Sequence, residues 1–182
     1  SAGAGLGAAL AILFFGNIYM IQVLSFVFGL LAVSMTYLLS RVYKTTPVLM
    51  LVLSGIIVGA LFSASTSLLK YLADPINQMP SIVFWMLGSL NNSSNKDLLI
   101  VGPIMVVGIA ILLLIRWRIN LLAMGEDDAR ALGVNTAQIR AIIIVCATVI
   151  SASAVSVAGI IGWIGLVIPH IGRLLVGPDN KL

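Results

Sequence analysis

The 182-residue chain is 60% hydrophobic and only 9% charged, with a net charge of +4 and a mean hydropathy of +1.16. This composition excludes a water-soluble domain, which would carry far more charge at this length. Apolar blocks recur at about the 20 residues that a helix needs to cross a bilayer, and the short alternating segments of a membrane β-barrel do not occur. We therefore predict an all-α, polytopic membrane protein.

Six apolar blocks predict six membrane-crossing helices within one transmembrane domain, residues 1–182. The first block is short and rich in Gly and Ala, and the last is interrupted by Pro169 and His170. The predicted spans are residues 3–16, 20–40, 47–69, 98–115, 141–158 and 160–176.

The connection between the third and fourth spans holds a shorter apolar piece, SIVFWMLGSL, at residues 81–90. It is too short to cross the bilayer, so we expect a small helix at the extracytoplasmic surface. The polar run from Asn91 to Asn95 ends it, because Asn and Ser favour turns.

The basic residues set the orientation, because cytoplasmic loops retain most Lys and Arg. With the first span running outward, the cytoplasmic side receives eight basic residues and the other side receives only Lys70 and Lys96. The eight are Arg41, Lys44, Arg116, Arg118, Arg130, Arg140, Arg173 and Lys181. The basic charge is thus an orientation signal, and since no basic face carries interleaved aromatics we expect no nucleic-acid partner.

The third span is the most polar of the central ones, with Ser54, Ser63, Ser65, Thr66 and Ser67. Small hydroxyl side chains either line an aqueous path or bond the carbonyl groups of their own helix and pack against neighbours. The residues alone leave both interpretations open.

The most polar run of the chain, GEDDARALGV, lies in a cytoplasmic loop at residues 119–140. Gly125 ends the preceding helix, three carboxylates favour a new helix N-terminus, and Gly133 supplies its C-terminal cap. A second helix starts at Asn135 or Thr136. The loop is therefore predicted to be helix, glycine turn, helix.

The first of these loop helices has an apolar side outside the bilayer. Charged loops usually only solvate a helical hairpin, and that interpretation gives the charges no specific role. Ala129, Leu132 and Val134, however, form a small apolar face with no lipid to bury in. Such a face suits docking onto a soluble partner.

The final block, GIIGWIGLVIPHIGRLLVGPD, begins with Gly159, Gly162 and Gly165 at three-residue spacing, which leaves one helix edge open to another backbone. Pro169 removes a backbone hydrogen bond and favours a kink. His170 and Arg173 share one helical face near the cytoplasmic end. They are either a functional pair or an interfacial His beside a topology-setting Arg.

Several site motifs are absent from the sequence. It holds no GxxxxGK[ST] phosphate loop, no GxSxG elbow and no HExxH pair. One His among scattered acidic residues makes no metal site, and the single cysteine, Cys146, lies in an apolar run where we expect it to pack. We expect no catalytic residue, no metal and no cofactor on this chain.

Two of these segments are similar to the FecCD-type permeases, the membrane subunits of ATP-driven importers of iron-siderophores, haem and vitamin B12. The first is GExxARxLGV and the second is GxIGxxGLVIPHxxRLLxGPD. The similarity extends to LSGIIVGALFSASTSLLKYLAD and FWMLGSL, and so to nearly the whole chain. In that family a subunit has ten spans, and this chain matches roughly the third to the eighth. We therefore expect about two spans to be missing at each end.

The resemblance also implies residue roles. The loop matching GEDDARALGV is a pair of coupling helices that sits in a cleft of the cytoplasmic ATPase, and the third span lines the pathway. The implied ATPase contacts are Gly125, Glu126, Ala129, Arg130, Leu132 and Gly133. The implied lining residues are Ser54, Ser63 and Thr66. The implied gate is Thr45, Thr46, Val48 and Leu49, and the signature helix holds Gly162, Gly165, Pro169, His170 and Arg173.

The implied activity is import of a metal chelate by alternating access, in the cytoplasmic (inner) membrane of a bacterium or archaeon. Iron-siderophore is the expected cargo, with haem, vitamin B12 and molybdate open. The implied partners are an identical or homologous second permease subunit, cytoplasmic ATP-binding subunits that hold ATP and Mg, an extracytoplasmic binding protein, and membrane lipid. The alternative is an intramembrane enzyme that uses His170 and Arg173.

Overall fold

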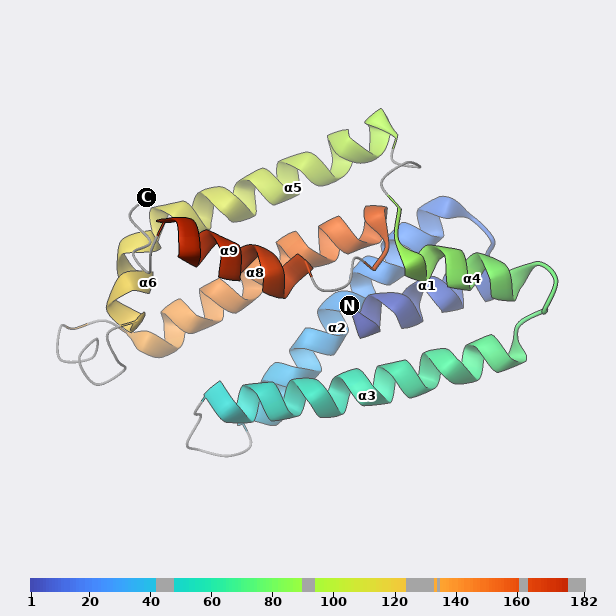
Figure 1. Cartoon of the computed structure of the whole chain (residues 1–182), viewed down its shortest axis with the longest axis horizontal. Coiled ribbons are helices and arrows are strands. Elements are labelled where there is room, and N and C mark those ends of the chain that lie inside the picture. The colour runs from blue at the N-terminus through green and yellow to red at the C-terminus, as the bar shows by residue number, and fades with distance from the viewer. Residues whose placement is uncertain (42–47, 90–93, 124–132, 134, 161–163, 177–182) are drawn as a thin grey trace. The chain divides into compact units, whose positions relative to one another are not determined.

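The computed structural model describes residues 1–41, 48–89, 94–123, 133, 135–160 and 164–176, and this part of the chain is helical with no strand, which confirms the all-α prediction (Figure 1). The helices are α1 (Ala2–Phe14), α2 (Ile18–Arg41), α3 (Val48–Leu72), α4 (Gln78–Leu87), α5 (Asn95–Leu114), α6 (Arg116–Ala123), α8 (Thr136–Ala158) and α9 (Ile164–Val176). The chain divides into two compact units. The first is Ser1–Leu99 with Ser151–Ile161, and the second is Ile100–Ile150 with Gly162–Leu182.

Four helices of the described part are long and apolar enough to cross a membrane, and they fall on four of the six predicted spans. They are Ile18–Ser40, Leu49–Leu72, Asn95–Leu114 and Thr136–Ala158. The other two predicted spans contain α1 and α9, with 13 residues each. A helix of that length is about 20 Å long, less than the roughly 30 Å of a bilayer core.

In the first unit, α1 packs against α2, α3 and α4 (Figure 1). Gly3 and Gly7 lie four residues apart on one face of α1 and bring its backbone against that of α2. A Cβ atom at Gly3 would overlap the carbonyl oxygen of Phe28, and one at Gly7 would overlap that of Leu24. Small residues at this spacing let membrane helices approach closely, so α1 and α2 form a tight pair.

The predicted surface helix is α4, which begins three residues earlier than expected and ends at Gly88. It is anchored as well as exposed. Its Ile82 side chain is 1% exposed and packs with Ala9 of α1 and with Ala73, which follows α3. This apolar cluster and the hydrogen bond that Gln78 Nε2 donates to the Leu13 carbonyl at 3.2 Å hold α4 against α1.

The last turn of α8 is joined to the end of α4 through two glycines in the left-handed region, Gly88 (φ 70°) and Gly159 (φ 74°). The Ser89 N–H donates to the Ala158 carbonyl at 2.8 Å, and a Cβ atom at Gly159 would overlap the Trp85 carbonyl oxygen. The prediction that Gly159 shares a glycine edge with the last helix is wrong. Gly159 ends α8 instead, because its backbone has a conformation that glycine adopts without strain.

In the second unit, α8 starts where the sequence predicts. The Asn135 side chain accepts a hydrogen bond from the Gln138 N–H at 3.2 Å, which caps the first turn. Further along α8, Cys146 is buried, as expected for a packing residue. Gly108 of α5 faces α8, since a Cβ atom there would lie 2.7 Å from Cγ1 of Ile150.

Candidate functional site

One face of α3 carries a polar row that lines a cavity of about 230 Å³, here called the Lys70 cavity. The row is Ser63, Thr66, Ser67 and Lys70, and the remaining lining residues are Ser1, Ala2, Met86 of α4 and Ile160. Spacings of three, four and seven residues place side chains on one helical face, which is why these four meet in one space.

The hydroxyl groups of α3 also bond their own helix. Thr66 Oγ1 donates to the Phe62 carbonyl at 2.8 Å and Ser67 Oγ to the Ser63 carbonyl at 3.1 Å. Ser54 Oγ donates to the Met50 carbonyl at 2.7 Å, and Ser54 is not among the residues of the Lys70 cavity. Two of the three predicted lining residues, Ser63 and Thr66, therefore share a cavity, and Ser54 lies apart from them.

Lys70 is the charged side chain of this cavity. It is half-buried and lies in the last turn of α3, where the helix carbonyl groups favour a cation. Within the part of the chain that the structure describes, Lys70 makes no ion pair. The sequence predicts only which side of the membrane Lys70 lies on. Its spacing from Ser63, Thr66 and Ser67 nevertheless places all four residues on one face of a helix.

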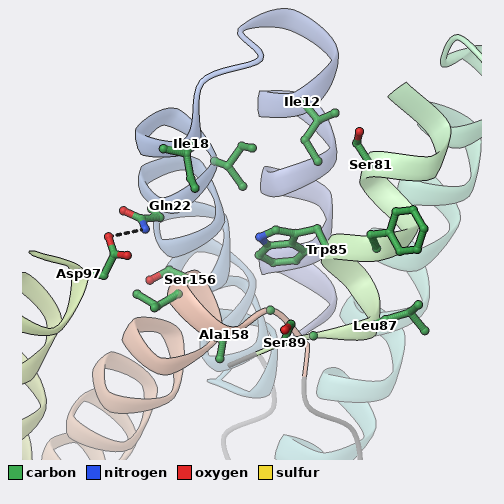
Figure 2. A pocket seen from close by; sticks show the side chains of 15 residues that line it. Ile12, Ile18, Gln22, Ser81, Trp85, Leu87, Ser89, Asp97, Ser156 and Ala158 are labelled. Carbon is green, nitrogen blue, oxygen red and sulfur yellow. Dashed lines mark hydrogen bonds between the residues drawn. The ribbon is translucent and has the colours of Figure 1, made fainter. Parts of the chain in front are cut away.

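A second cavity, of about 620 Å³, is also lined by residues of α4 and is here called the Asp97 cavity. Its walls come from α1, α2, α4, the start of α5 and the end of α8, and Trp85 projects into it from α4 (Figure 2). Figure 2 also shows Gln22 of α2 facing Asp97 of α5 on the opposite wall. The walls are largely apolar, with this one carboxylate among the lining residues.

Asp97 is 9% exposed and both of its oxygens accept hydrogen bonds. Gln22 Nε2 donates to Oδ1 at 2.9 Å, and the Ser94 N–H donates to Oδ2 at 2.9 Å. The bond to Ser94 caps the first turn of α5. Sequence reasoning missed this pair, because Gln22 and Asp97 are 75 residues apart and only the helix packing brings them together.

The predicted ATPase contacts fall mainly outside the described residues, which applies to Gly125, Glu126, Ala129, Arg130 and Leu132. Gly133 is described and has φ 76°, in the left-handed region. That conformation suits the glycine cap predicted at this position.

Of the predicted gate residues, Thr45 and Thr46 lie outside the described part of the chain. Val48 is the first residue of α3, and Leu49 follows it with its side chain 63% exposed. Two of the four predicted gate residues, Val48 and Leu49, therefore lie at the beginning of α3.

Of the signature helix, Gly162 lies outside the described residues, and Gly165, Pro169, His170 and Arg173 lie in α9. His170 is exposed. Among the residues that the structure describes, no three His, Cys, Asp or Glu side chains come close enough to hold a metal ion.

Comparison with known proteins gives one consistent match. Residues 1–182 match the FecCD transport family. A molybdate import system permease protein from Haemophilus influenzae is 38% identical over 181 residues, which is 100% of this chain and 54% of that protein. A protein from Helicobacter pylori described as a "probable iron chelatin transport system permease protein" is 44% identical over 179 residues, 98% of this chain and 54% of its own length.

A cobalamin import system permease protein from Halobacterium salinarum is 36% identical over 183 residues, which is 100% of this chain and 49% of that protein. A solved structure described as an inward-facing metal-chelate type ABC transporter superposes with a TM-score of 0.92 at 38% identity, and covers 99% of this chain and 57% of that one. The chain thus spans about half the length of the curated relatives it matches.

Proposed function

Because this chain belongs to the FecCD transport family, we propose that it forms part of the membrane-spanning subunit of an ATP-binding-cassette importer. The observation that carries the proposal is the family match over all of residues 1–182. Four helices that can cross a membrane, and a polar cavity beside one of them, support the same function.

The importer works by alternating access, with a second permease subunit, identical or closely homologous, across a central pathway. ATP and Mg reside on cytoplasmic ATPase subunits, and an extracytoplasmic binding protein delivers the cargo. The complex is placed in the cytoplasmic membrane. The chain itself carries no catalytic residue and binds no cofactor.

The coupling contact is assigned to Gly125, Glu126, Ala129, Arg130, Leu132 and Gly133. The left-handed backbone of Gly133 supports it, because this conformation is typical of the glycine that ends a helix such as the one the sequence predicts before it. A short helix with an apolar face can then transmit the movement of the ATPase as a rigid body. The gate is assigned to Thr45, Thr46, Val48 and Leu49.

The cargo is proposed to be a metal chelate, with iron-siderophore first, and haem, vitamin B12 and molybdate as other members of the set. Relatives named for molybdate, iron chelate and cobalamin import share between 36% and 44% identity with this chain, so overall similarity does not select among them. The choice depends on the residues that line the pathway.

The competing function, an intramembrane enzyme built on His170 and Arg173, has less support. The two residues lie on one helix, and His170 is exposed with no cluster of metal-binding side chains around it in the described part of the chain. That function also gives no role to the loop around Gly133.

The test uses the full-length protein with its own ATPase. Gly133→Pro forces φ to about −65° at a position where it is 76°, and Ala129→Glu adds a charge to the apolar face. Both variants are expected to insert normally and to lose ATPase assembly and uptake of labelled iron chelates. Ala129→Ser, which keeps a small side chain, is the matched control. Normal uptake by both disruptive variants would show that the coupling assignment is wrong.

A further inference from the structure

The Lys70 cavity combines three features that together point to a ligand. Its cation lacks an ion-pair partner in the described part of the chain, hydroxyl groups lie on the same face of α3, and its volume is about 230 Å³. A lysine inside a membrane-spanning segment is costly unless it reaches water or an anion. A site of this composition recognises negatively charged oxygen atoms.

We propose that Lys70 binds anionic oxygen groups of the transported substrate at the outer end of α3, beside a wall formed by Ser63, Thr66 and Ser67. The proposal rests on the importer function above and identifies the charge of its cargo. Lys70 supplies the positive charge. The hydroxyl oxygens of Thr66 and Ser67, whose protons are donated to the helix backbone, fix the shape of the wall beside it.

The group that reaches Lys70 is either a carboxylate or phenolate arm of a larger chelate or a free oxyanion, since the cavity is open and its volume sets no limit on the whole ligand. Both sources present the same chemistry to Lys70.

Two structural roles could also explain a lysine here. A cation in the last turn of α3 is stabilised by the helix dipole, and a lysine near a helix end can extend to the membrane surface. Both roles are general and would be served at any position around the helix. Neither accounts for the alignment of Lys70 with three hydroxyl residues on the wall of one cavity.

The experiment uses the full-length permease in proteoliposomes with its ATPase and binding protein, and measures ATP-dependent uptake of two probes, labelled molybdate and labelled ferric citrate. Wild type is expected to take up at least one of them. Lys70→Met and Lys70→Gln are expected to lower that uptake at least about tenfold, the change that 1.4 kcal/mol produces. Lys70→Arg is expected to keep most of it.

Lys96→Met is the control, because Lys96 is an exposed lysine predicted on the same side of the membrane and is not among the cavity residues. Its uptake should equal that of wild type. An effect on molybdate alone identifies a free oxyanion as the cargo, and an effect on ferric citrate alone identifies the carboxylates of a chelate.

Each other outcome overturns the proposal. Undiminished uptake in both neutral variants removes Lys70 from the site and leaves the importer function intact. Loss of uptake in Lys70→Arg as well would show that a positive charge at this position is not sufficient for uptake, which contradicts the proposed role of Lys70. Uptake of neither probe by wild type contradicts the expected transport of a free oxyanion or a carboxylate chelate, and the importer function is then tested by the coupling variants at Gly133 and Ala129, whose ATPase assembly is measured separately.

Discussion

The two cavities of the first unit each have one charged side chain on their walls. The two charged groups differ in whether other residues of the unit bind them. In the Asp97 cavity, the carboxylate accepts hydrogen bonds from Gln22 and from the Ser94 backbone. In the Lys70 cavity, the ammonium group has no ion pair within the described residues. A buried charge with its own donors is part of the framework, whereas a half-buried charge without a counter-charge is available to a ligand.

Helix α4 contributes to both spaces, since Trp85 lines the Asp97 cavity and the adjacent Met86 lines the Lys70 cavity. The comparison therefore depends on α4 staying in place. Variants that displace α4 should disrupt both cavities. Variants at Asp97 and at Lys70 should separate a charge that stabilises the fold from a charge that binds a ligand.

Gly159→Ala should have the largest effect. Its Cβ atom would overlap the Trp85 carbonyl oxygen, and a non-glycine residue at φ 74° costs about 1–2 kcal/mol before that overlap is counted. We expect a loss of at least about 2 kcal/mol in stability, measured as thermal unfolding of the full-length protein in detergent. Gly59→Ala is the control, because a Cβ atom there meets nothing within 4 Å. Equal melting temperatures for the two variants would contradict the contact.

Asp97→Ala should come next, at about 1–3 kcal/mol of stability, because it leaves Gln22 and the Ser94 N–H without their acceptor. Asp97→Asn retains one acceptor oxygen and should lose less. The measurement is again thermal unfolding, with uptake recorded beside it. If Asp97→Ala unfolds like wild type but stops uptake, the carboxylate contacts cargo and the contrast between the cavities is reversed.

Thr66→Val should have a smaller effect, a loss of about 0.5–1 kcal/mol in stability, since the new side chain has nearly the same shape and the lost bond to Phe62 lies within one helix. Uptake should fall by less than in Lys70→Met. Ser65→Ala removes an equivalent bond to Leu61 outside the Lys70 cavity and should leave uptake unchanged. Equal uptake by the two variants would exclude Thr66 from the pathway.

Lys70→Met should have the smallest effect on folding, within about 0.5 kcal/mol, since no ion pair is lost and only the helix dipole is left uncompensated. The variant thus separates stability from transport, because uptake is expected to fall sharply. A large drop in melting temperature would instead assign Lys70 a structural role like that of Asp97.

The sequence predicts the helices well where the signal is local. Hydrophobic length locates four spans, and the cap at Asn135 locates the start of α8. It fails where distant segments meet. The glycine spacing around Gly159 suggested a helix edge, because no local pattern shows that the backbone turns there to meet Trp85.

The candidate site shows the same division. Helical spacing places Ser63, Thr66 and Lys70 on one face of α3, but that face becomes a cavity wall only when Ala2, Met86 and Ile160 from other segments lie beside it. The bond between Gln22 and Asp97 likewise exists only once α2 and α5 are assembled.

The junction of Gly88 and Gly159 also limits how α4 can move. A helix turns about its axis by about 100° per residue, so a twist of α4 by one such step would turn Met86 toward the direction in which Trp85 now points. The hydrogen bond from Ser89 to Ala158 and the contact between the two glycines oppose such a twist. α4 therefore has no independent rotation, and any motion that reshapes one cavity must carry the end of α8 with it.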